Sequence, residues 1–133
     1  MKTSYRSRIT FTGSEEVINR LKGEVDKLML VAADAVNDGL LVLYDGAKDD
    51  CPVNTDPSDT ATIRLKDSIY IEPAKKHKRS IVGRVRVGKK TAMHVEFGTS
   101  KMSPRPFLRQ QIFFNRAKIR KMTRDKIKAA MGL

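Results

Sequence analysis

Residues 94–109 read HVEFGTSKMSPRPFLR, and this stretch decides how the last third of the chain is expected to fold. Gly98 suits a backbone with positive φ, and Pro104 and Pro106 favour an extended segment ahead of a helix. Because proline is common at the first position of helices, Pro106 is expected to begin one. Phe107 follows it as a predicted packing anchor on the apolar face. The stretch therefore predicts a corner between two structural elements.

Glu96 is the only anion in residues 73–124, which are otherwise strongly basic. Net charge already keeps such a surface soluble, so a lone carboxylate is expected to have a local task. We expect it to accept hydrogen bonds from backbone amides near Gly98 and Thr99, or from Arg105 across the corner. A cation on an adjacent copy of the chain is the alternative partner. The neighbours of Glu96 that are expected to be buried are Val95 and Phe97.

Before this corner, apolar residues at helical spacing run from Val17 to about Lys48 and predict a long N-terminal helix. Thr12 and Glu15 have capping-box spacing at its start. At 1.5 Å per residue the helix would be about 50 Å long, which exceeds the size of a compact domain of this length. The helix is therefore expected to bend near Gly39 or to overhang onto a neighbouring subunit.

Two strands are predicted between the helices. Residues 65–72 close with a strand that Pro73 ends, and residues 80–87 alternate between apolar and polar side chains. The connecting residues 74–79, AKKHKR, are expected to form a basic hairpin tip. Residues 49–62 are rich in Asp, Pro, Thr and Ser and predict a flexible loop.

After the hairpin, residues 91–97 are expected to form one or two helical turns that end at Gly98. A second long helix is predicted from Pro106 to about Ala130. Its expected inward residues are Leu108, Ile112, Ile119, Met122 and Ile127. The predicted fold class is therefore α+β, with a long N-terminal helix, a small antiparallel hairpin sheet and a long C-terminal helix. Residues 1–133 are expected to form a single domain.

The charge of the chain is high and uneven, with 27 Lys and Arg against 15 Asp and Glu. Cations dominate residues 75–90 and 101–133, whereas most acidic residues lie in residues 13–60. A basic half attracts a polyanion, either nucleic acid or an acidic protein face, although a solvated helix face explains the same charge. The candidate polyanion or partner contacts are Lys75, Lys76, Lys78, Arg79, Arg84 and Arg86.

The sequence holds few residue patterns that indicate catalysis or metal binding. His94 and Glu96 form a His-x-Glu fragment that lacks a third ligand or a nucleophile. A Mg²⁺ site would need rigid carboxylates, but the acidic group here lies in a Pro-rich loop. That group comprises Asp45, Asp49, Asp50, Asp56 and Asp59. A single cysteine, Cys51, allows no intramolecular disulfide and is expected to be a partly buried hydrophobe. We expect no catalytic residue, no metal and no cofactor.

No apolar run reaches the roughly 18 to 20 residues that span a bilayer, and the first residues lack the apolar core of a secretory signal. A soluble protein made in the cytosol, without a membrane partner, is therefore expected.

The segment VEFGTSKMSPRPFLR, preceded by CPVNT and LKDSI, resembles the tail-completion or neck protein family of long-tailed bacteriophages and prophages. The resemblance spans nearly the whole chain. It departs from the family pattern at Asp56, where the family has glycine, and at the intervening residues 57–64. The residues that carry the resemblance are Glu96, Phe97, Gly98, Thr99, Arg105, Pro106, Phe107 and Leu108.

This resemblance implies a non-enzymatic structural subunit of the virion that joins the tail to the head and assembles in the host cytoplasm. It implies a ring of copies with about six-fold symmetry, next to head-closure and tail-tube or terminator proteins. Double-stranded DNA would pass through the lumen without sequence-specific contacts. The alternative is a stand-alone basic DNA-binding protein, conceivably a metal-dependent nuclease.

Overall fold

The computed structural model describes residues 13–53 and 64–133. Its elements follow one another as α1 (Ser14–Asp50), the short 3-10 turn η1 (Lys66–Ser68), β1 (Ile69–His77), β2 (Ser80–Val87), α2 (Thr91–Phe97) and α3 (Arg109–Ala130). The two strands pair in antiparallel fashion as one hairpin. The predicted α+β fold, with a long helix at each end of a small sheet, is confirmed.

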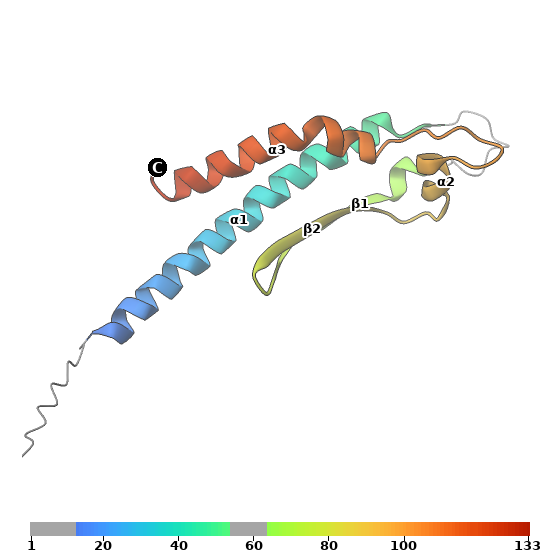
Figure 1. Cartoon of the computed structure of the whole chain (residues 1–133). Helices are drawn as coiled ribbons and strands as arrows, with labels where there is room; N and C mark the ends of the chain where they lie inside the picture. Colours follow the sequence, from blue (N-terminus) through green and yellow to red (C-terminus); the bar gives the residue numbers. More distant parts are fainter. Residues whose placement is uncertain (1–12, 54–63) are drawn as a thin grey trace, which may run out of the picture.

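α1 is a continuous helix of 37 residues, which at 1.5 Å per residue makes it about 55 Å long. Gly13 precedes its first turn and the helix start has no side-chain cap; the expected cap residue Thr12 lies outside the described residues. The helix was expected either to bend near Gly39 or to overhang, and it overhangs. Residues 14–27 are all exposed, and this end of α1 extends beyond the rest of the molecule (Figure 1).

Gly39 does not end or interrupt α1, and its role is close packing. A Cβ atom at Gly39 would lie 2.7 Å from Cγ2 of Ile119 on α3, so glycine lets that side chain reach the α1 backbone. α3 therefore packs antiparallel along one side of α1, while the hairpin lies along the other (Figure 1). Between the two helices, Nζ of Lys126 donates to Oδ2 of Asp38 at 2.6 Å.

The predicted end of the first strand at Pro73 is wrong, since β1 continues to His77. The pairing with β2 shifts between Glu72 and Lys75, and a two-stranded ribbon has only edge strands, in which proline is tolerated. The next amide, N of Ala74, donates instead to Oδ1 of Asn37 on α1 at 2.8 Å. Residues 74–79 are consequently not a loop, and only residues 78–79 form the turn.

The predicted start of the last helix at Pro106 is also wrong, because α3 begins at Arg109. Residues 103–106 belong to no helix or strand, and each proline disfavours helical backbone at the residue before it. Ile112 was expected to face inward but is 55% exposed. The other expected inward residues are all half-buried: Leu108, Ile119, Met122 and Ile127. The expected short helix before Gly98 is confirmed as α2.

The main core is small and lies where the C-terminal end of α1 meets η1, α2 and the segment before α3. Its largest fully buried side chains are Phe107, Leu65 and Val95. Cys51 is buried in the same cluster as a free thiol, in agreement with its expected role as a small hydrophobe. No helix within the described ranges has both the length and the apolar composition needed to cross a membrane.

Phe107→Ala should lower the free energy of unfolding by about 3–5 kcal/mol, because it removes a ring with 0% exposure from the centre of this core. Phe113→Ala is the matched control, since this ring on α3 is 67% exposed and its loss should cost less than about 1 kcal/mol. Urea denaturation of the dilute protein, followed by circular dichroism, measures both. Equal losses for the two variants would contradict the packing role of Phe107.

Candidate functional site

The corner between α2 and α3 is organised by one buried carboxylate. Glu96, near the end of α2, is 4% exposed. Its Oε2 accepts hydrogen bonds from N of Phe107 at 2.9 Å and from N of Leu108 at 3.1 Å, and its Oε1 accepts one from N of Arg109 at 2.9 Å. These amides form the start of α3, whose own cap position provides no side-chain hydrogen bond. Glu96 therefore caps α3 from a distant position in the sequence.

The Arg109 side chain completes the environment of Glu96. Its Nε lies 3.2 Å from Oε1 of Glu96, and its Nη2 donates to the backbone oxygen of Glu96 at 3.1 Å. Burial by itself would raise the pKa of Glu96. The hydrogen bonds from the backbone of Arg109, Phe107 and Leu108, together with the Arg109 side chain, outweigh burial and leave the pKa below its ordinary value. The carboxylate is thus held ionised at the positive end of the α3 dipole.

Backbone geometry closes the same corner. Gly98 has a φ of 77°, and a Cβ atom there would lie 2.8 Å from both O of Met102 and N of Pro104. Thr99 and Met102 pair across the turn, with N of Thr99 donating to O of Met102 at 2.8 Å. The main-chain N of Arg105 donates to O of Val95 at 2.8 Å. These contacts place Val95, Gly98, Thr99, Met102 and Arg105 in the same corner as Glu96.

The predicted partners of Glu96 were wrong in detail. Its amide donors are those at the start of α3 rather than those near Gly98 and Thr99, and its cation is Arg109 rather than Arg105. The reason is that the expected amides are already used: N of Gly98 donates to O of His94 and N of Thr99 to O of Met102. The first amides of α3 have no carbonyl partner within their own helix and are free to bind the carboxylate. The expected burial of Val95 is confirmed, but Phe97 is exposed, with the Arg109 guanidinium 4.3 Å above its ring.

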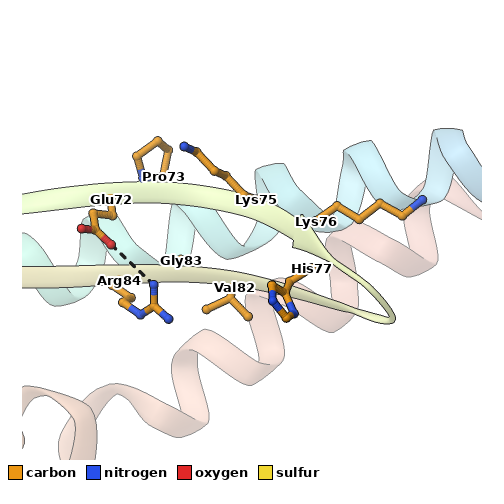
Figure 2. Close-up of a pocket in the computed structure, with 8 residues that line it drawn as sticks. All are labelled: Glu72, Pro73, Lys75, Lys76, His77, Val82, Gly83 and Arg84. Atoms are coloured by element: carbon orange, nitrogen blue, oxygen red, sulfur yellow. Dashed lines mark ion pairs between the residues drawn. The ribbon is translucent and has the colours of Figure 1, made fainter.

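A second feature is the outward face of the hairpin. Glu72 on β1 pairs there with two cations of β2, at 3.0 Å to Nε of Arg86 and 3.6 Å to Nη1 of Arg84. Both arginines remain at least half exposed. The hollow in Figure 2 is lined by residues of both strands, and Lys75 and Lys76 point in different directions there. The surface offers distributed positive charge rather than a pocket that converges on one anion.

The structure separates the cations that the sequence grouped together. Lys75 is opposite Val82 and Lys76 is opposite Ile81, so the two lysines project from opposite faces of the ribbon. Nζ of Lys76 lies 3.8 Å from Oδ1 of Asp26 on α1. Lys78, with a φ of 50°, and Arg79 form the exposed turn. The outward face therefore combines Lys75 with the β2 arginines, and the turn adds two more cations.

The candidate metal ligands do not converge. His94 is exposed while Glu96 points into the corner, and Asp45, Asp49 and Asp50 are all exposed on α1. Two further candidates, at positions 56 and 59, lie outside the described residues. Among the residues that the structure describes, no group of three or more His, Cys, Asp and Glu side chains is placed to hold a metal ion.

Sequence reasoning missed the exposed aromatic pair of α3. The rings of Phe113 and Phe114 meet edge to face with centroids 5.7 Å apart, and both are exposed. Adjacent residues on a helix point about 100° apart, so two neighbouring phenylalanines rarely both face one core. That spacing was the available signal for an exposed apolar surface.

Comparison of the chain with known protein families, with curated proteins and with solved structures finds no match.

Glu96→Gln should lower the free energy of unfolding by about 2–4 kcal/mol, because the amide keeps the shape but places an N–H donor against other N–H donors. The exposed Asp125→Asn on α3 is the matched carboxylate-to-amide control and should leave stability nearly unchanged. Urea denaturation at neutral pH measures both variants. Wild-type stability in Glu96→Gln would contradict the capping role.

The stability difference between wild type and Glu96→Gln should also depend on pH. Because the folded pKa of Glu96 lies below its ordinary value of 4.5, the carboxylate stabilises the fold fully above that pH. Its contribution is lost as the pH falls through the lower folded pKa. The stability difference between wild type and Glu96→Gln should therefore be constant near neutral pH and shrink in acid. A difference that persists unchanged to pH values near 2 would argue against an ionised cap.

Replacing Lys75, Lys76, Lys78 and Arg79 by Gln should leave the fold intact or slightly more stable. All four are exposed cations in a basic hairpin, and the ion pair of Lys76 with Asp26 is long and open to solvent, so its loss costs little. Binding of duplex DNA should weaken. The slope of the logarithm of the binding constant against the logarithm of the salt concentration should become shallower by about 0.9 for each DNA phosphate that the variant no longer neutralises. Fluorescence anisotropy against NaCl concentration measures this slope. A variant with four α3 cations neutralised is the control: Lys118, Arg120, Lys121 and Arg124. An equal change in slope for the control would show that DNA affinity does not reside in the hairpin.

Proposed function

We propose that this chain is a non-enzymatic structural subunit of the neck or tail-completion ring of a tailed bacteriophage or prophage. One observation carries the proposal. Within the described ranges, nine hydrophobic residues are buried, whereas sixteen large hydrophobic side chains are exposed. A small core combined with so much exposed apolar surface is typical of a subunit that buries part of this surface against other subunits.

The corner supports a structural role for the motif. The residues that resemble the family motif hold α2 and α3 together, and both oxygens of the Glu96 carboxylate accept hydrogen bonds from the α3 start. A carboxylate used in this way is not available as a general base. The motif thus stabilises the subunit, as a family of ring-forming structural proteins would require.

The charge distribution supports contacts between copies and with DNA. Acidic residues outnumber basic ones by nine to four in α1, whereas basic residues outnumber acidic ones by eight to one in α3. A subunit with this polarity attracts the opposite face of its neighbour in a head-to-tail ring. The basic hairpin would then face either the DNA in the lumen or an acidic head-closure, tail-tube or terminator protein.

A stand-alone DNA-binding protein is the second candidate function. The observation that favours it is the exposed cationic hairpin, which needs only a polyanion and no ring. If the nuclease version of this candidate is correct, the protein will cleave plasmid DNA with Mg²⁺ or Mn²⁺. Asp49→Ala or Asp50→Ala would then abolish the cleavage.

The proposal predicts the phenotype of a phage that lacks the protein. A stop codon early in its gene should give DNA-filled heads and separate tails, which electron microscopy of the lysate would show. Infectivity should fall by orders of magnitude and return when the wild-type chain is supplied from a plasmid. A synonymous change at the same codon is the control and should give joined particles.

Joined, infectious particles from the stop-codon phage would refute the neck function. If such particles form and the purified protein still binds DNA, the stand-alone DNA-binding function replaces it.

A further inference from the structure

The N-terminal part of α1 carries an apolar stripe that no element within residues 13–53 and 64–133 covers. Val17, Ile18, Leu21 and Val25 recur at helical spacing, and each is between 48% and 61% exposed. Residues 14–27, here called the overhang, are exposed at every position, whereas the stripe becomes partly buried from Leu28 onward. An uncovered stripe of four large aliphatic residues is a favourable docking surface.

An apolar groove lies elsewhere on the same chain. One hollow of this groove is lined by Leu40 and Leu43 of α1, Val85 of β2, Leu108 just before α3, and Ile112 on α3. A second hollow shares Leu108 with the first and is also lined by Met93 and Phe97 of α2; the two adjoining hollows are together called the groove. Both of these α2 residues are exposed, as is Ile112. The groove and the overhang are therefore two separate apolar surfaces.

The overhang cannot fill the groove of its own chain. α1 is one continuous helix, and its own Leu40 and Leu43 form part of the groove wall. A continuous helix cannot turn back onto residues four or more turns further along itself. Any helix of this chain that docks in the groove in this way must come from another copy.

The charges around the two surfaces are complementary. The groove is bordered by Arg84 in one hollow and Lys90 in the other, and Arg109 lies over Phe97 at its edge. The first turn of the overhang is acidic, with Glu15 and Glu16, and the overhang as a whole carries four anions against three cations. An amphipathic helix with an acidic start thus fits an apolar groove with basic borders.

We propose that the overhang of one copy docks in the groove of the next copy, with Leu21 against Ile112 at the centre of the contact. The donor and acceptor surfaces differ, so each copy can donate to one neighbour and accept from another. Such a head-to-tail contact builds a ring when its rotation closes. The inference rests on the proposed function and names the surfaces through which the ring copies would join.

The test uses one variant of each surface in the full-length chain. Leu21→Asp blocks the overhang and leaves the groove intact, whereas Ile112→Asp blocks the groove and leaves the overhang intact. Leu30→Asp is the control, because Leu30 is 69% exposed on α1 but lies on the side opposite the stripe. Sedimentation velocity over a range of protein concentrations measures the assembly state.

Wild type and Leu30→Asp should form multimers, and each blocked variant alone should be monomeric. An equimolar mixture of Leu21→Asp and Ile112→Asp should give dimers and nothing larger, because only one productive contact remains. Melting followed by circular dichroism checks that both variants fold, and Phe97→Asp replaces Ile112→Asp if the latter lowers the melting midpoint.

Three results would overturn the proposal: a wild type that stays monomeric at every soluble concentration, a groove variant that assembles like wild type, or a mixture without dimers. Assembly of Ile112→Asp but not of Leu21→Asp would indicate that two overhangs pair with each other. The neck function fails separately. If phage carrying either blocked variant joins heads to tails normally, the proposed contact is wrong and the neck function stands. If phage without the protein joins heads to tails normally, the neck function is wrong, and sedimentation still decides on the contact.

Discussion

The hydrogen-bonded carboxylate of Glu96 is the interaction on which the rest of the structure depends. A buried charge is tolerated only when its hydrogen-bonding capacity is met, and here the first amides of α3 and the Arg109 side chain meet it. The end of α2 is thereby fixed to the start of α3. Since Phe107 lies between them at 0% exposure, the same contact also places the largest side chain of the core.

Fixing the start of α3 sets its path along α1. Gly39 lets Ile119 approach the α1 backbone, and Lys126 pairs with Asp38 further along the helices. On the other side of α1, Asn37 holds the hairpin through the amide of Ala74. These three contacts with the flanking elements all lie in the C-terminal half of α1. Residues 14–27 of α1 are left exposed with an apolar stripe, and this stripe is the basis of the proposed contact between copies.

The sequence could indicate the importance of Glu96 but not its partners. Its isolation among cations suggested a local structural role, and the structure shows that role. The choice of Arg109 over Arg105 depended on where α3 begins, and a shift of one helical turn changes which amides are free. The sequence offers six cations of the hairpin as candidate polyanion or partner contacts, but β-pairing places two of them, Lys75 and Lys76, on opposite faces. That division follows from the continuation of β1 past Pro73 to His77, because adjacent residues of a strand point to opposite faces.

The sequence by itself determined the order and kind of the elements, because helical spacing in α1, alternation in β2 and glycine at position 98 are local properties. It also determined the excess positive charge and the length of α1, and hence that this helix had to bend or overhang. Only the tertiary structure decided between these outcomes. Gly39 became a packing site rather than a bend because Ile119, 80 positions away, fills the space above it. Contacts of this kind join residues distant in sequence, so local spacing and propensity do not predict them.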